Sequence, residues 1–175
     1  MHFQCMVTGL KQSSSVVSIG FSVDESAPNT FTQGQVDLNL SPLDREVFVV
    51  LAVNMDPFTP EAVAGVDTKV ESSLTTTRQT AVANLSNSNC IAASGNFIKA
   101  AGFVDGGVSF QSIGAETPPA NLDFIAIIAT SDFFIQVAGQ GNLNTRGVDG
   151  KLYGFRATAN ADIFAALVQS EVLSA

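Results

Sequence analysis

The sequence has little of what enzyme active sites are usually built from. His2 is its only histidine, tryptophan is absent, and charged residues make up 14% of its 175 residues. A single histidine excludes Ser–His and Cys–His nucleophilic pairs and zinc sites built on several histidines. The motifs G-x-S-x-G, G-x-x-x-x-G-K-[ST] and G-x-G-x-x-G are also missing. We therefore predict no catalytic residues, no cofactor-binding residues and no enzymatic activity.

The aromatic residues are mostly of the kind that fills a core. The chain contains 13 Phe and one Tyr, Tyr153, whereas Tyr and Trp are the residues that usually recognise sugars and peptides. The 16 Asp and Glu residues could supply the carboxylate pair of a glycosidase, but such sites also need aromatic platforms for the sugar. The composition therefore argues against a glycosidase and against a carbohydrate-binding module.

The charge that is present is acidic. The formal net charge is -8, and the eight Lys and Arg residues are scattered along the chain. Direct binding to nucleic acid needs clustered basic residues, so we predict no direct, sequence-specific contact with nucleic acid. Because charge is also too sparse to cover the surface of a lone domain, part of the apolar surface is expected to be buried against neighbouring subunits. A monomeric domain with an apolar surface is the alternative.

Cysteine and targeting signals add little. Cys5 and Cys90 are able to pair, but two cysteines so far apart do not form a disulfide framework, and two buried free thiols are the favoured interpretation. The first residues lack a signal-peptide pattern. The longest apolar run, Phe124–Ala129, is much shorter than a membrane-spanning helix. We expect synthesis in a cytoplasm and no insertion into a membrane.

Strand patterns dominate the chain. Val17, Ile19, Phe21 and Val23 alternate with small polar residues, which is the period of a half-buried strand. The nearly continuous apolar run Glu46–Met55 predicts a central strand buried on both faces. Further strands are predicted at Phe31–Leu40, Thr68–Thr80 (exposed or at an edge), Val108–Ile113, Leu122–Thr130, Phe133–Gly139 and Lys151–Thr158.

Other segments depart from this alternation. Ala81–Ala101 predicts one short helix with irregular chain around it, and Ile163–Val172 fits either a final strand or a helical tail. Leu122–Thr130 and Phe133–Gly139 are close enough in sequence to form a hairpin. Proline, glycine and asparagine predict loops at Asp56–Gly65, Glu116–Asn121 and Gln140–Asp149.

These elements indicate one domain, residues 1–175. Eight or nine predicted strands without a βαβ rhythm favour a mostly β, antiparallel sandwich or jelly roll with one short helical insert. The loops Asp105–Gly107, Asn142–Asn144 and Asp149–Gly150 carry oxygen ligands that could bind structural calcium. No EF-hand spacing is present, and Asp, Asn and Gly are common turn residues. We therefore predict no metal ligands.

The whole chain resembles a viral coat protein of the single jelly-roll type. The segments Leu43–Asp56 (LDREVFVVLAVNMD) and Lys151–Thr158 (KLYGFRAT) are similar in style to coat proteins of marine viruses. The resemblance implies a capsid subunit in a virion, made in the host cytoplasm. It also implies trimeric, pentameric or hexameric capsomers and contact with other virion proteins. The chain departs from many small coat proteins because Lys11 is the only basic residue among its first 40.

Two kinds of function follow from these observations. The first is a structural subunit of a virus capsid, which self-assembles through packed β-sheets into a closed shell. Loops such as Asp56–Gly65 and Gln140–Asp149 would then make contacts between subunits. The second is a decoration, spike or adhesin-type module that attaches to another surface.

Overall fold

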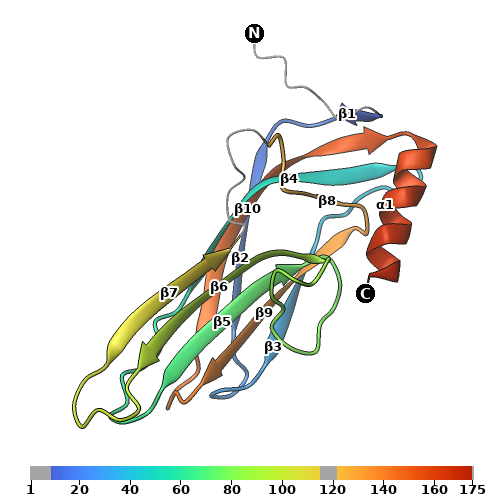
Figure 1. The fold of residues 1–175 in the computed structure, drawn as a ribbon. Helices are drawn as coiled ribbons and strands as arrows, with labels where there is room; N and C mark the ends of the chain where they lie inside the picture. Colours follow the sequence, from blue (N-terminus) through green and yellow to red (C-terminus); the bar gives the residue numbers. More distant parts are fainter. Residues whose placement is uncertain (1–8, 115–121, 175) are drawn as a thin grey trace.

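The computed structural model describes residues 9–114 and 122–174. These residues are mostly β: two antiparallel sheets lie face to face, and one helix covers the outer side of one of them (Figure 1). The mostly β, antiparallel, sandwich-like architecture expected from the sequence is therefore confirmed.

The first sheet, sheet A, is built around two long strands. β10 (Gly147–Ala159) pairs with β4 (Glu46–Pro57) along most of its length, and β4 pairs on its other side with the short β8 (Ala126–Ile128). The outer edge of β10 is shared by β1 (Leu10–Gln12) and β2 (Val17–Asp24).

The second sheet, sheet B, has the order β3-β9-β5-β6-β7. All its strand pairs are antiparallel. The strands are β3 (Thr32–Asp37), β9 (Asp132–Gln140), β5 (Thr68–Thr75), β6 (Cys90–Lys99) and β7 (Val108–Gly114).

The strand pairs are nested in sequence. β5 pairs with β6, β4 with β8, β3 with β9 and β2 with β10. The first member of each pair precedes, and the second follows, the pair inside it. The chain between β2 and β10 thus folds as one long antiparallel hairpin whose paired strands belong alternately to the two sheets, with β7 as an added strand beside β6.

Alternation along β4 explains why this strand is buried on both faces. Phe48 and Val50 point into the core between the sheets, whereas Val47 and Val49 belong to a second apolar cluster on the outer side of sheet A. The prediction of a central strand at Glu46–Met55 is confirmed. Its burial on both faces holds over Val47–Val50, whereas Asn54 farther along is exposed.

The second cluster exists because a helix covers it. α1 (Ala161–Leu173) packs Ile163, Phe164, Leu167 and Val168 on the outer face of sheet A. Asn160 caps its first turn, since its side-chain oxygen accepts a hydrogen bond from the backbone N–H of Ile163. The open choice at Ile163–Val172 is thereby settled as a helix.

The helical insert predicted within Ala81–Ala101 is wrong. Residues 81–89 form turns and irregular chain, and Cys90–Lys99 is strand β6. The backbone of this segment pairs with β5 on one side and with β7 on the other, and this pairing overrides the helix propensity of its Ala residues. Within the described residues the helix lies at the C-terminal end instead.

Two further expectations are corrected. Thr68–Thr80 was expected to be exposed or at an edge, yet β5 lies in the middle of sheet B and is mostly buried. Its hydroxyls are compatible with burial because they find partners: Ser73 Oγ donates to Gln136 Oε1 at 2.6 Å. The hairpin between Leu122–Thr130 and Phe133–Gly139 does not form, since β8 pairs with β4 in one sheet and β9 with β3 and β5 in the other.

The remaining strand predictions are confirmed with shifted ends. The strands at Phe31–Leu40 and Leu122–Thr130 are shorter than expected, and the loops at Asp56–Gly65 and Gln140–Asp149 lose residues to β4 and β10. The loop expected at Glu116–Asn121 lies outside the described residues.

Candidate functional site: a polar network of loops at one end

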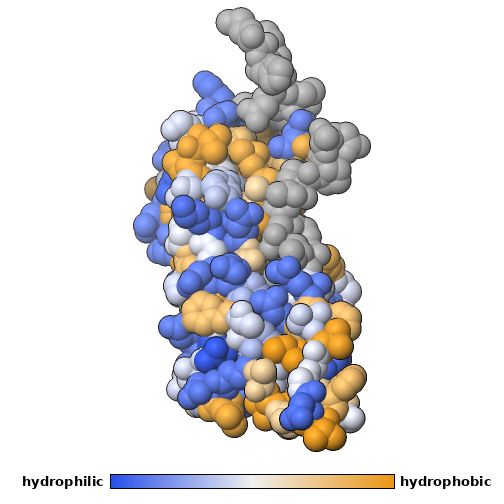
Figure 2. Space-filling model, turned by 90° about the vertical axis from the view of Figure 1, so that its left-hand side faces the viewer, coloured by the Kyte–Doolittle hydropathy of each residue, from blue (hydrophilic) through white to orange (hydrophobic). Residues whose placement is uncertain are grey.

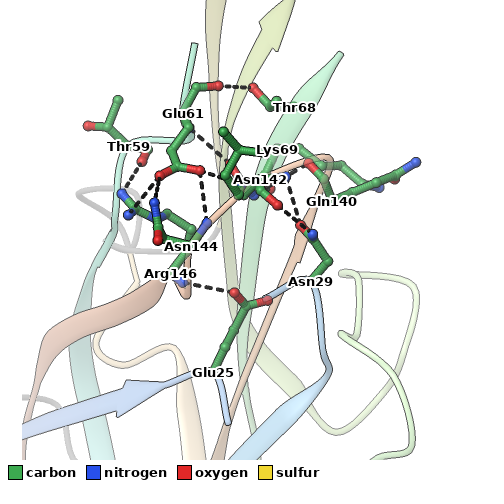
Figure 3. A network of polar contacts seen from close by, with 11 residues as sticks. Glu25, Asn29, Thr59, Glu61, Thr68, Lys69, Gln140, Asn142, Asn144 and Arg146 are labelled. Atoms are coloured by element: carbon green, nitrogen blue, oxygen red, sulfur yellow. Dashed lines mark hydrogen bonds and ion pairs between the residues drawn. The ribbon is translucent and has the colours of Figure 1, made fainter. Parts of the chain in front are cut away.

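Three loops meet at the lower end of the two sheets in the view of Figure 1. They are residues 25–31 between β2 and β3, residues 58–67 between β4 and β5, and residues 141–146 between β9 and β10. Figure 3 shows the polar side chains that join them. The structure therefore brings together the two loops that the sequence singled out for contacts between subunits, and adds a third.

Asn142 lies at the centre of this network and is buried. Its side-chain amide donates to the carbonyl of Lys69 at 3.0 Å, and its side-chain oxygen accepts the backbone N–H of Glu61 at 2.9 Å. Its own backbone exchanges two hydrogen bonds with the side chain of Asn29, at 2.7 and 2.9 Å. One asparagine thus connects all three loops and the start of β5.

Glu61 fixes the tip of the loop between β9 and β10. Its carboxylate accepts hydrogen bonds from the backbone N–H groups of Leu143 and Asn144 and from the Asn144 side chain, the last at 2.6 Å. Arg146 lies 3.5 Å from the same carboxylate. These donors, led by the Asn144 amide, lower the pKa of Glu61 from its ordinary value. Glu61 is therefore ionised at neutral pH.

Glu25 anchors the other side of the network from a buried position. Its two carboxylate oxygens accept the backbone N–H groups of Gly139 at 2.5 Å and of Arg146 at 2.8 Å. Gly139 is required here because a Cβ at this position would lie 2.8 Å from the Asn142 amide nitrogen and 3.0 Å from the Glu25 carboxylate. The carboxylate is thus fitted tightly against the backbone of β9.

The chemistry of this network is structural. The carboxylates of Glu25 and Glu61 are directed at N–H donors of the protein, an arrangement that orders loops and leaves few lone pairs for a ligand. Across residues 9–114 and 122–174, no group of three or more His, Cys, Asp or Glu residues is placed to hold a metal ion.

The candidate calcium loops are not assembled into one site. Asp105 lies in the exposed turn after β6, and Asp149 lies within β10, where it accepts a hydrogen bond from the Ser22 hydroxyl at 2.6 Å. Asn142 and Asn144 use their side chains in the loop network. Sequence reasoning did not single out Glu25 or Glu61, because their partners are between 81 and 121 positions away.

A second candidate site, a partly polar hollow, lies between α1 and the start of β6. A hollow of about 530 Å³ is lined by Cys90, Glu171, Thr76 and Asn89 together with apolar side chains from both sheets. Burial raises the pKa of the Cys90 thiol to about 11, so the thiolate that a nucleophilic cysteine needs is scarce. The Glu171 carboxylate accepts hydrogen bonds from Ala129 and Thr130. Cys90 therefore does not have the properties of an activated nucleophile.

Cys90 is a free thiol and half-buried. Cys5, its possible partner, and His2 lie outside the described residues. Tyr153 lies half-buried in the middle of β10, where it offers no exposed aromatic platform.

The one helix in the described part of the chain, α1, has 13 residues and is too short to cross a membrane. No protein-family model matches the chain, and no curated protein is significantly similar to it. Its function must therefore be argued from its own residues and geometry.

Proposed function

We propose that this chain is a structural subunit of a virus capsid, a single jelly roll that assembles with further copies of itself into a closed shell. The observation that carries the proposal is the nested strand pairing. In an eight-stranded jelly roll, a long antiparallel hairpin is rolled so that its successive pairs alternate between two facing sheets. The pairs β2–β10, β3–β9, β4–β8 and β5–β6 follow this scheme.

Jelly rolls serve viral capsids, lectins and cupins, and the residues of this chain favour the first of these. Cupin enzymes use several histidines to bind a metal, and this sequence has one. Lectins use exposed Trp and Tyr, whereas Trp is absent here and Tyr153 is half-buried within a strand. A shell subunit needs neither.

The surface supports assembly. Several large apolar side chains are more than half exposed, among them Leu43 at 94%, Val104 at 88% and Leu143 at 72%. Burying such side chains between subunits contributes about 25 cal/mol per Å² before the entropy cost of association. Leu143 is held at the tip of the ordered loop network, so this end of the domain presents a rigid surface to a neighbour.

The charge fits a shell whose genome is neutralised by something else. With a net charge of -8 and scattered basic residues, the subunit itself does not provide a phosphate-binding surface. The proposal therefore places a separate basic protein, polyamines or an inner membrane between this subunit and the nucleic acid.

The test is the native mass of the expressed chain, measured by light scattering after size exclusion, with electron microscopy of each peak. We expect particles, or regular fragments of a curved shell, built from many copies. A monomer at high protein concentration would contradict the proposal. A discrete trimer that never forms larger species would favour the decoration, spike or adhesin-type module instead.

A further inference from the structure

The free edge of sheet B differs from the other sheet edges in this molecule. β7 pairs with β6 from Val108 to Gly114 in continuous register, with no bulge. Among the described residues no strand lies on the outer side of β7. Seven residues give an edge about 23 Å long. Such an edge presents a row of backbone N–H and C=O groups to any strand that approaches it.

The other edges are covered or short. β2 and β3, at the opposite side of the two sheets, lie against each other: Val23 Cγ2 is so close to Gly34 that a Cβ there would be 2.6 Å away. β8, the remaining edge of sheet A, has three residues and pairs with β4 over Phe48–Val50. β7 is therefore the long, flat edge that natural proteins usually protect.

The usual protection is missing from β7. Proteins discourage edge pairing with Lys, other charged residues, Pro or bulges. The sequence of β7, VSFQSIG, contains no charged residue and no Pro, and its pairing with β6 has no bulge. Val108 and Phe110, which lie on one face of the strand, are 49% and 55% exposed. Figure 2 faces this edge, and apolar side chains gather at its lower end. In the turn before β7, Phe103 and Val104 are 52% and 88% exposed.

Charge indicates which partner fits. Two copies of a chain with net charge -8 repel each other over most of their surface. Asp105 is the only charged residue between 100 and 114, so two copies can approach here with little repulsion. An antiparallel strand is also self-complementary, because a two-fold axis brings the same residues together from both sides.

We infer that β7 is the contact at which two copies of this chain join, pairing edge to edge about a two-fold axis so that their two B sheets form one continuous sheet. This inference rests on the proposed function and specifies one of its interfaces. A two-fold contact alone produces only pairs. A closed shell therefore needs a second contact, for which the loop network at the end of the domain is the rigid candidate.

The test combines a charge variant with a matched control. Phe110→Glu places two like charges opposite each other near the two-fold axis, where they oppose pairing, and Phe110→Leu keeps the apolar contact. Val17→Glu makes the same change on the β2 edge, at a side chain that is 41% exposed. We expect Phe110→Glu to lower the native mass at least twofold, with partial recovery in high salt, and the other two variants to keep the wild-type mass. Circular dichroism checks that all variants fold.

A cysteine scan gives a positive signal. Single cysteines at 109, 110, 111 and 112, in a Cys5→Ser and Cys90→Ala background, are oxidised under mild conditions. In a two-fold antiparallel pair one residue faces itself across a Cβ distance of about 5 Å, so we expect a disulfide-linked dimer at one position and much less at its neighbours. A second scan retains Cys5. A disulfide within one chain would show that its own first residues occupy the edge and would overturn the inference.

The outcomes separate this inference from the proposed function. If the wild type forms large particles and Phe110→Glu does so equally, the β7 contact is wrong and the shell proposal stands. If the wild type forms only dimers that Phe110→Glu dissociates, the β7 contact is right and the shell proposal is wrong. A wild-type monomer without disulfide-linked dimers overturns both.

Discussion

Phe21 of sheet A and Phe133 of sheet B meet edge to face across the core, with ring centroids 6.2 Å apart and ring planes at 75°. Phe133 is fully buried and Phe21 is 8% exposed. Their contact joins the first strand of the outermost nested pair to a strand of the opposite sheet. It is therefore one of the interactions that hold the two sheets together.

Phe133→Leu tests this contact. Losing the aromatic pair and leaving a small cavity should lower the free energy of unfolding by about 1–2 kcal/mol. The same change at Phe58, whose side chain is 37% exposed, should have an effect within about 0.5 kcal/mol. Urea unfolding followed by circular dichroism measures both values. Equal effects of the two variants would show that the ring contact adds nothing to general burial.

The strand pattern could be predicted because the buried faces alternate in the sequence. Ile19, Phe21 and Val23 lie toward the core as their spacing indicates, and β4 is buried on both faces over Val47–Val50, where every residue is apolar. Where the alternation was strong, only the strand ends shifted, because hydrogen bonding to a partner strand decides where pairing stops.

The prediction failed where burial depends on a partner. Three hydroxyl residues of β5 are buried, namely Ser72, Ser73 and Thr75. A run of Ser and Thr predicts an exposed strand unless the hydrogen-bond partners of the hydroxyls are known. Gln136, which accepts the Ser73 hydroxyl and donates to Thr75, lies 61 and more positions away. The loop network could not be predicted for the same reason, because the hydrogen-bond partners of Glu25 and Glu61 are distant in sequence and are brought close only by folding.

Asn142→Ala should loosen the end of the domain that carries the loop network. The change removes a donor from the Lys69 carbonyl and an acceptor from the Glu61 N–H, and it leaves buried polar groups without partners. We expect a loss of about 1–3 kcal/mol in the free energy of unfolding and faster proteolysis within residues 58–67 and 141–146. Leu143→Ala, next to it and 72% exposed, is the control. Unchanged cleavage rates would show that Asn142 does not order these loops.

Cys90 should react slowly with thiol reagents in the folded chain. Its pKa of about 11 leaves about one thiolate in a thousand at pH 8, against about one in ten for a thiol with the ordinary pKa of 9.0. In a Cys5→Ser variant, we expect modification by a disulfide reagent to be about 100-fold slower before unfolding in urea than after it. A fast reaction in the native state would mean that the thiol is open to solvent and ionised.

Glu171 ties the end of α1 to the chain just after β8, and its raised pKa predicts that stability depends on pH. Its carboxylate accepts the backbone N–H of Ala129 at 2.8 Å and the Thr130 hydroxyl at 2.5 Å. Burial, the largest influence, nevertheless raises the pKa of this carboxyl above its ordinary value. Between the ordinary pKa and the raised one, the Glu171 carboxyl therefore keeps its proton in the folded state but has lost it in the unfolded chain. As pH rises from the ordinary carboxyl pKa through the raised one, this group makes folding less favourable, and above that range the cost is constant.

Glu171→Gln removes this titration and can keep the hydrogen bonds to Ala129 and Thr130. We expect the variant to gain stability relative to the wild type as pH rises from about 5 to about 8, a range that stays above the sequence pI of 4.3. The pKa of Asp132 is also raised by burial, but Asp132 is present in both proteins, so its effect largely cancels in the stability difference between variant and wild type.

Asp105→Asn is the control. It removes one exposed charge, and its stability difference from the wild type should hardly change with pH. Urea midpoints across this range measure all three proteins. If the stability difference of Glu171→Gln changes with pH as little as that of the control, Glu171 has the same pKa in the folded and unfolded states. Its burial then imposes no cost on the ionised carboxylate.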